Sequence, residues 1–437
     1  MTTWSLASAL LLTISTQALD GRAIATVPRA IVSYATRPVL ASEVIATSQA
    51  DPDAKQAISA MLSELQQAGL TNPDQGVWIQ SHDGAIAAGR LSSRPLPSAS
   101  LTKSATTLAA LLTWGSNHRF MTDVSITGDI SGDTIKGDLV IEGNGDPLFV
   151  WEEAIALGNK LNQLGIKRVQ GNLVVAGNFA MNFEAELPES ASLLRVALDS
   201  RQWQGEVTEH ATMPAGTPKP ELVILGNIRT STNLSPQANR KLLIRHASLP
   251  LWQILKKMNT FSNNAMAEML AAQLGGGKQV AIMTSQATGI SSNEIKLING
   301  SGLGQANQIS PRANVAILME IHNRAQVEGL TLADLFPMSN CNCGTIEDRK
   351  MPAGAIVKTG TLSDVSALAG VFQTKKYGVI WFAIANRGEG DLDAFHRSQD
   401  RLLQFLVKQW GLPKLPNASF AETPWHDSDR NQIYSDR

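Results

Sequence analysis

Ser100 and Lys103 lie three residues apart at the start of a predicted helix, in the sequence LPSASLTKSATTLAALLTWG. Residues at this spacing share one face of a helix, so the lysine amine can reach the serine hydroxyl. A serine hydroxyl is a weak nucleophile at neutral pH and needs a base, and a lysine acts as that base only when it is partly neutral. Burial, the positive end of the helix dipole and a nearby cation all lower a lysine pKa. The pair therefore indicates a nucleophile and its base, although the same spacing also occurs in ordinary capped helices.

A second segment, Lys358-Thr359-Gly360-Thr361, follows the strand-like run AIV. A lysine and a threonine hydroxyl at a strand edge can bind a carboxylate, and a glycine lets a substrate backbone approach closely. The segment is therefore a candidate rim of a binding site. The alternative is a solvated edge lysine before a turn.

A third segment, Ser262-Asn263-Asn264, lies between two predicted helices. Alone it needs no function, because it would serve as a helix N-cap. What distinguishes it is the order of the three segments along the chain. Ser100 comes first, then Ser262, then Lys358, the first two at helix starts and the last on a strand.

The elements around these segments predict a sheet built from both ends of the chain. Residues 55–70 have apolar positions at a helical period, and the segment that follows contains a hairpin signal at Asp83-Gly84. Toward the other end, three strand-like runs precede a terminal helix: Ala355–Val357, Ser366–Phe372, Val379–Ala385 and then Asp393–Trp410. We therefore expect an α+β fold in which one antiparallel sheet with helices contains strands from both ends.

The rest of the chain has different sequence patterns from these two ends. Residues 121–248 contain short β-like runs and predict an inserted β-rich domain. The apolar run Leu6 to Ile14, followed by small residues, is typical of a secretory signal; the alternative is a buried N-terminal helix, since MTTWS carries no Lys or Arg. The expected domains are a signal peptide at 1–25, a split catalytic domain at 26–120 and 249–412, the insert at 121–248 and a flexible C-terminal tail at 413–437.

Composition excludes several classes of function. The chain has 437 residues with 37 basic and 38 acidic side chains, so it has no basic field for nucleic acid. Its seven His and two Cys form no HExxH or CxxC spacing, and we expect neither a metal nor an organic cofactor. No stretch after the signal approaches the length of an integral membrane span. Cys341 and Cys343 either form a disulfide in a short loop or remain two free thiols.

The three motifs in this order resemble the SxxK, SxN and KTG motifs of penicillin-binding proteins and serine β-lactamases. Further segments resemble the D-alanyl-D-alanine carboxypeptidase/endopeptidases of the class C low-molecular-mass penicillin-binding proteins: PSASLTK, SNNAMAE, NGSGLGQANQISP, CGTIEDR, KTGTLSDVSALAG and, in the insert, GDLVIEGNGDP and LGIKRVQGNLVV. The resemblance covers roughly residues 77–410 and implies a penicillin-binding-protein/serine β-lactamase-like domain with an inserted domain. The chain departs from the family at Asn299 and Cys343, where the family usually has Asp.

Carried onto matching positions, the resemblance implies roles for the residues of the first two motifs. Ser100 would be the nucleophile and Lys103 its base during acylation. Ser262 would relay protons to the leaving amine, and Asn264 would hold the substrate amide.

The resemblance also implies how the third motif binds substrate. Lys358 and Thr359 would bind the terminal carboxylate. The backbone N–H groups of Ser100 and Thr361 would form the oxyanion hole.

The function that the resemblance implies is an exported serine DD-peptidase, periplasmic or extracytoplasmic, with or without a peripheral association with the membrane. It would remove the terminal D-alanine from peptidoglycan stem peptides, and also cut D-alanyl cross-links, through an acyl-serine intermediate. β-Lactam antibiotics would be covalent inhibitors.

Two alternatives stay open. One is a β-lactamase or esterase on the same fold, and the other is a catalytically idle peptidoglycan-binding protein. The intact motifs disfavour the idle protein, because a binding module needs no base beside the nucleophile. In class A β-lactamases a glutamate on a loop between the second and third motifs is the base for deacylation. No acidic residue in this interval of the chain has a matching sequence context. Glu268 is better explained as a residue of its helix.

Overall fold

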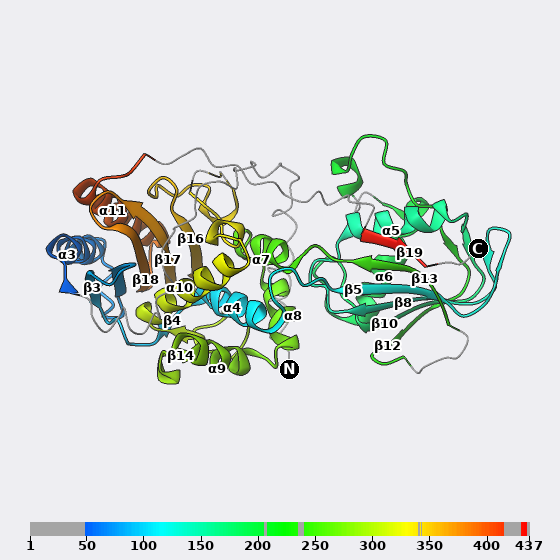
Figure 1. Ribbon diagram of the computed structural model, residues 1–437, viewed down its shortest axis with the longest axis horizontal. Coiled ribbons are helices and arrows are strands. Elements are labelled where there is room, and N and C mark those ends of the chain that lie inside the picture. The colour runs from blue at the N-terminus through cyan, green and yellow to red at the C-terminus, as the bar shows by residue number, and fades with distance from the viewer. Residues whose placement is uncertain are drawn as a thin grey trace. The chain divides into compact units, whose positions relative to one another are not determined.

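The computed structural model describes residues 49–204, 208–234, 240–339, 341, 343–414 and 430–434. The expected signal peptide at 1–25 lies outside these residues. The described residues divide into two compact units (Figure 1). Unit 1 contains those up to Ser116 and from Leu255 to 414, and unit 2 contains those from Asn117 to Ile254 together with 430–434.

Unit 1 is built on a six-stranded sheet to which both ends of the chain contribute. In spatial order the strands are β1 (Gln49–Ala50), β3 (Ile86–Arg90), β2 (Gly76–Ser81), β18 (Gly378–Arg387), β17 (Val365–Thr374) and β16 (Ile356–Leu362). Neighbouring strands are antiparallel except β1 and β3, which are parallel. The early strand β2 pairs with the late strand β18, with Val77 opposite Ile384. This confirms the predicted sheet in which the two ends of the chain meet.

Helices cover both faces of this sheet. On one face α3 (Pro52–Gln67) packs against α11 (Leu392–Trp410), and their apolar residues share one core with the strands (Figure 1). On the other face α10 (Pro311–Val327) contacts β2, β17 and β18. The sequence specifies where α10 begins, because Ser310 Oγ accepts the Ala313 N–H and a proline occupies the first helical position.

The remaining helices of unit 1 surround α4 (Thr102–Trp114), which is buried over most of its length. They are α7 (Leu251–Thr260), whose first residues belong to unit 2, α8 (Asn264–Gln273) and α9 (Gly277–Thr288). A small sheet in the order β14 (Ile295–Lys296), β15 (Gln308–Ile309), β4 (Leu96–Pro97) leads through its last strand toward α4. None of the described helices in either unit is both long and apolar enough to cross a membrane.

Unit 2 is built on two sheets and two helices. The larger sheet has the order β12 (Ile228–Ser231), β10 (Leu173–Asn178), β8 (Leu139–Asn144), β5 (Met121–Ile126), β13 (Lys241–Ala247), β19 (Asn431–Ile433). The smaller has the order β11 (Val223–Ile224), β9 (Arg168–Val169), β7 (Thr134–Ile135), β6 (Ile130–Ser131). α5 (Trp151–Gln163) and α6 (Leu187–Ala197) contribute to a single apolar core with these strands. The β-rich insert expected at 121–248 falls within this unit.

Residues 430–434 correct part of the expected flexible tail at 413–437. The strand β19 pairs antiparallel with β13 at the edge of the larger sheet, with Ile433 opposite Ile244. Arg430 is buried, and its guanidinium donates to both carboxylate oxygens of Glu153 at 2.6 and 2.8 Å. The polar, proline-punctuated sequence does not reveal these partners, because they lie far away along the chain. Residues 415–429 and 435–437 lie outside the described residues.

Candidate active site

Ser100 lies in the 3₁₀ turn η2 (Ala99–Leu101), which leads into α4. Other segments of the chain press closely on this turn. A Cβ added at Gly360 would lie 3.0 Å from Ser100 N, and one added at Gly302 would lie 1.8 Å from Ala99 O. Ala99 has a φ of 45°, a left-handed conformation that a non-glycine residue keeps only when its surroundings impose it. The packing therefore fixes Ser100 at the N-terminus of α4.

Lys103 follows in the first turn of α4 and is fully buried. Its Nζ lies 2.9 Å from Ser100 Oγ, 2.7 Å from Asn264 Oδ1 and 2.8 Å from Ser301 O. Burial lowers the pKa of Lys103 to about 7, and the negative charge of Glu268 partly opposes that effect. A neutral amine has two N–H donors and one lone pair. When it donates to the two oxygens of Asn264 and Ser301, its lone pair remains for the Ser100 hydroxyl proton, as a general base requires.

Lys358, on β16, is also fully buried. Its Nζ donates to Ser262 Oγ at 3.0 Å and to Thr359 O at 2.7 Å. Burial, and to a smaller extent the charge of Lys103, hold the pKa of Lys358 well below its usual value. The second motif is thus connected to the third by a hydrogen bond from a lysine that readily loses its proton.

Ser262 lies between α7 and α8 with a left-handed φ of 53°. Such strain at a non-glycine residue persists where the surrounding structure fixes it, and it is common at active sites. The N-cap of α8 is Asn263, whose Oδ1 accepts a backbone N–H of the first turn. The capping role that the sequence left open for this motif therefore falls to Asn263, and the Ser262 hydroxyl remains available to the site.

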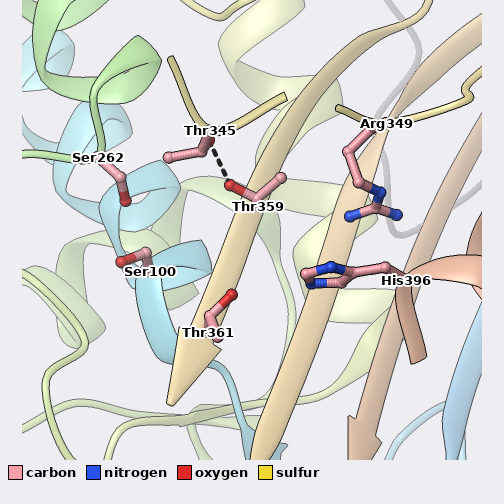
Figure 2. Close-up of a pocket in the computed structure, with 7 residues that line it drawn as sticks. All are labelled: Ser100, Ser262, Thr345, Arg349, Thr359, Thr361 and His396. Carbon is pink, nitrogen blue, oxygen red and sulfur yellow. Dashed lines mark hydrogen bonds between the residues drawn. The ribbon is translucent and has the colours of Figure 1, made fainter. Parts of the chain in front are cut away.

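Both serines open into one pocket, together with residues from the third motif and two further segments (Figure 2). The lining residues are Ser100, Ser262, Thr345, Arg349, Thr359, Thr361 and His396. Of the predicted site residues, Lys103, Asn264 and Lys358 are absent from this lining, and they contact the serines or one another instead.

Three lining residues received no role from the sequence: Thr345, Arg349 and His396. Thr345 and Arg349 belong to the segment CGTIEDR, so a signal for them existed in the resemblance. His396 lies on α11 and had no such signal. Thr345 Oγ1 and Thr359 Oγ1 share a hydrogen bond of 2.6 Å (Figure 2). Arg349 is held by Asp400, whose Oδ1 lies 2.8 Å from Nη2, so the wall of the pocket carries a fixed guanidinium.

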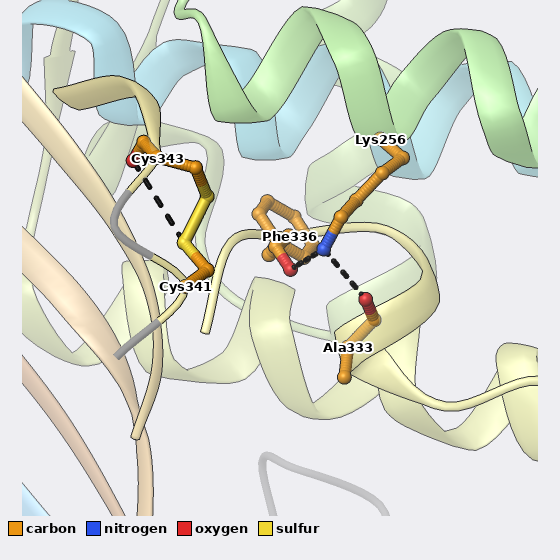
Figure 3. The surroundings of a disulfide bond; sticks show 5 residues. All are labelled: Lys256, Ala333, Phe336, Cys341 and Cys343. Atoms are coloured by element: carbon orange, nitrogen blue, oxygen red, sulfur yellow. Dashed lines mark hydrogen bonds between the residues drawn. A yellow bond between two sulfur atoms is a disulfide. The ribbon is translucent and has the colours of Figure 1, made fainter. Parts of the chain in front are cut away.

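Cys341 and Cys343 form a disulfide, one of the two states that the sequence left open (Figure 3). Their Cα atoms lie 5.2 Å apart. The next residue, Gly344, has a φ of 59°, and a Cβ there would lie 2.1 Å from Thr260 O. The turn that brings Thr345 to the pocket is therefore packed directly against the end of α7, and only glycine fits at its first position.

Asn299 stands where the resembled family usually has Asp. Its Oδ1 accepts the Gly302 N–H at 2.9 Å, and its Nδ2 donates to Leu303 O at 2.9 Å. An amide can accept and donate at once, whereas a carboxylate can only accept. The asparagine side chain therefore makes two hydrogen bonds within the loop 299–303, one as acceptor and one as donor.

A serine with a buried lysine at a helix start, and a second serine bonded to a buried lysine on the adjoining sheet, define a serine hydrolase of the penicillin-binding type. The sequence model of the D-Ala-D-Ala carboxypeptidase 3 (S13) family matches residues 56–182 and 223–408. The chain therefore belongs to this family. The match confirms the predicted class of enzyme, a serine-type D-Ala-D-Ala carboxypeptidase.

Individual relatives are distant but cover most of the chain. The carboxypeptidase DacB of Mycolicibacterium smegmatis is 26% identical over 369 residues, which are 74% of this chain and 79% of that protein. The D-alanyl-D-alanine carboxypeptidase DacB of Haemophilus influenzae is 23% identical over 398 residues, 68% of this chain and 82% of that protein.

Solved structures show the same fold. A predatory endopeptidase of Bdellovibrio bacteriovorus, acylated by penicillin G and in complex with an immunity protein, has a TM-score of 0.72 at 22% identity, over 82% of this chain and 99% of that chain. Penicillin-binding protein 4 of H. influenzae has a TM-score of 0.61 at 19% identity, over 82% of this chain and 99% of that chain. These likenesses confirm the predicted α+β penicillin-binding-protein fold.

Proposed function

We propose that the protein removes the terminal D-alanine from peptidoglycan stem peptides through an acyl-enzyme on Ser100, and that it also hydrolyses D-alanyl cross-links. The observation that carries the proposal is the buried Lys103 amine, which two oxygens orient toward Ser100 Oγ at 2.9 Å. A binding module has no use for such a base, so the contact disfavours the idle peptidoglycan-binding protein. The likeness to an endopeptidase solved as a penicillin G adduct supports acyl-serine chemistry on this fold.

In the proposed reaction Lys103 takes the proton of Ser100 while Oγ attacks the carbonyl carbon of the penultimate D-alanine. The backbone N–H groups of Ser100 and Thr361 stabilise the oxyanion. Ser262, which accepts a hydrogen bond from Lys358, passes a proton to the leaving amine, and D-alanine departs. Water then hydrolyses the ester and restores the Ser100 hydroxyl.

Substrate binding is assigned to groups that the catalytic contacts leave available. Asn264 Oδ1 is occupied by Lys103, so its Nδ2 is the group that holds the substrate amide. The hydroxyls of Thr359 and Thr361 line the pocket and receive the terminal carboxylate. Lys358 contacts Ser262 Oγ and Thr359 O, so its part in carboxylate binding is to hold these two lining residues in place.

The proposal includes the place of action and the inhibitors. The expected signal at 1–25 would export the protein to the periplasmic or extracytoplasmic side, where peptidoglycan lies. A disulfide between Cys341 and Cys343 fits an oxidising compartment. β-Lactams would acylate Ser100, because they present a reactive amide and a carboxylate to the same pocket.

The test is incubation of the purified protein with defined muropeptides, cross-linked and uncross-linked, followed by mass spectrometry. We expect loss of one D-alanine from pentapeptides and separation of cross-linked dimers. Ser100→Ala should abolish both reactions and also labelling by penicillin. Ser104→Ala, which removes another buried hydroxyl from the same helix, should change neither. A covalent penicillin adduct on the Ser100→Ala protein would contradict the assignment, and a wild-type protein that cleaves neither substrate would favour the idle alternative.

A further inference from the structure

Glu268, on α8, holds a loop that contacts the catalytic lysine. Its Oε2 accepts the Gly300 N–H at 3.1 Å, and its Oε1 accepts the Ser301 N–H at 3.0 Å. The carbonyl oxygen of the same Ser301 lies 2.8 Å from Lys103 Nζ. A single residue of this loop therefore connects the carboxylate to the amine.

The helix α8 controls both oxygens that orient the amine. Asn264 and Glu268 are four residues apart, so they lie on one face of the helix. Asn264 Oδ1 contacts Lys103 Nζ directly at 2.7 Å, whereas Glu268 acts through Ser301. The direction of the Lys103 lone pair thus depends on two side chains one turn apart.

The loop is confined on two sides. A Cβ at Gly300 would lie 2.4 Å from Ala267 O on α8, and a Cβ at Gly302 would lie 1.8 Å from Ala99 O in the turn that carries Ser100. The loop cannot move toward either side to find new acceptors. Loss of the carboxylate would leave two backbone N–H groups without their partner, and a buried N–H without an acceptor is costly.

We propose that Glu268 is a positioning residue for acylation, which fixes the Ser301 carbonyl against Lys103 and so directs the lone pair of the amine at Ser100. The inference rests on the proposed function and adds a residue to its machinery. It also revises the interpretation from sequence, in which Glu268 is an ordinary residue of its helix. Both carboxylate oxygens are engaged by N–H groups, which is the arrangement of an anchor.

Glu268 also acts on Lys103 through its charge, and this gives a readout that a purely structural glutamate would lack. Its carboxylate opposes the effect of burial on the Lys103 pKa. The charged groups coupled to Lys103 among the described residues are Glu268 of α8 and Lys358 of β16, whereas α9 and α10, which also pack on α4, place none that shifts its pKa. Removing the carboxylate charge therefore lowers the pH at which Lys103 loses its proton.

The test compares three variants by the second-order rate constant for acylation by labelled penicillin, measured from about pH 5 to about pH 9. For the wild type we expect an acid limb near the Lys103 pKa of about 7, followed by a plateau. Glu268→Gln should lower the plateau about tenfold or more, because the lysine is misoriented, and should move the acid limb to lower pH. Glu268→Asp keeps the charge on a shorter side chain, so the plateau should fall while the limb stays near that of the wild type. Glu320→Gln, which removes a carboxylate paired with Arg324 on α10, is the matched control and should change neither.

Each outcome bears on the inference. A lower plateau with an unmoved limb in Glu268→Gln would indicate a merely structural residue and overturn the proposal, and so would a wild-type plateau in Glu268→Asp. Thermal unfolding monitors the fold of each variant, and if Glu268→Gln does not fold, the plateau of Glu268→Asp decides. A wild-type protein that penicillin does not acylate would overturn the proposed function itself. An acylated wild type with unaffected Glu268 variants would remove this inference alone.

Discussion

Replacing Lys103 by methionine tests whether this amine is the base. The substitution keeps a side chain of similar length and removes the nitrogen that lies 2.9 Å from Ser100 Oγ. A lysine with the ordinary pKa of 10.5 is neutral in about one molecule in 3,000 at pH 7, whereas about half of the Lys103 side chains are neutral if burial brings the pKa to about 7. Burial therefore increases the concentration of the base about a thousandfold.

We expect Lys103→Met to lower the rate constant for acylation by penicillin by roughly 10²- to 10⁴-fold, the usual contribution of a general base. In the wild type the rate should fall as pH drops, because protonation of the amine removes the lone pair. From about pH 7 to about pH 5 the neutral fraction, and with it the rate, should fall about fiftyfold. The Lys103→Met protein should show no such acid limb.

Lys256→Met is the matched control. Lys256 is a half-buried lysine of α7 whose Nζ donates to Ala333 O at 2.7 Å and to Phe336 O at 2.6 Å, so its loss also removes two hydrogen bonds from unit 1 but leaves the pocket intact (Figure 3). Acylation is followed by stopped-flow fluorescence with a labelled penicillin, and folding by thermal unfolding. The assignment would be refuted by a folded Lys103→Met protein that keeps more than about a tenth of the wild-type rate, or by a wild-type rate that is constant below neutral pH.

Three further outcomes are expected. The penicilloyl adduct on Ser100 should persist for minutes or longer while a D-Ala-D-Ala peptide turns over, and rapid steady-state hydrolysis of penicillin without release of D-alanine would favour the β-lactamase alternative. Thiol titration of denatured, unreduced protein should find Cys341 and Cys343 unreactive, and two reactive thiols would exclude the bridge. Burial raises the pKa of the Asp146 carboxyl to about 7. Between about pH 4 and pH 7 the folded state therefore keeps a proton that the unfolded state has lost, and the free energy of unfolding falls as pH rises through that window. Asp146→Asn should flatten the corresponding fall in melting temperature, and an unchanged pH dependence would contradict the reasoning.

The motifs and the sheet could be predicted from the sequence because the signals for them are local. Ser100 and Lys103 lie within one turn of helix, and Lys358 and Thr359 are adjacent on a strand. The strands of unit 1 can be predicted from their composition and from the turns between them, without knowledge of the fold. That strands from both ends share one sheet could be inferred, but the pairing of β2 with β18 could not, because several strand orders fit the same segments.

The contacts that tune the lysine could not be predicted, because they join segments that are distant along the chain. Asn264 Oδ1 and Ser301 O lie 161 and 198 residues from Lys103 in sequence. No periodicity indicates that the loop at Ser301 packs between α8 and the turn of Ser100, or that His396 of the terminal helix reaches the pocket. The same reason explains why the prediction of a flexible tail is wrong at residues 430–434. Arg430 is buried against Glu153 in unit 2, a partner that lies far away along the chain.

The burial that makes Lys103 a base also opposes folding. At neutral pH the unfolded chain binds a proton on this amine with a pKa of 10.5, and the folded chain binds it with a pKa of about 7, a difference that costs roughly 5 kcal/mol of stability. The full cost applies below about pH 7, where both states bind the proton. It disappears as pH rises from about 7 to about 10.5, because the unfolded state loses the proton only near the upper end of this range. Lys103→Met relieves this cost, although it leaves the oxygens of Asn264 and Ser301 without a donor, whereas Lys256→Met loses its two hydrogen bonds without comparable relief. The inactive Lys103→Met protein should therefore unfold at a higher temperature than the active Lys256→Met protein at neutral pH. The opposite order would contradict this reasoning, because the contacts to Asn264 and Ser301 would then stabilise the fold by more than the burial of the amine costs.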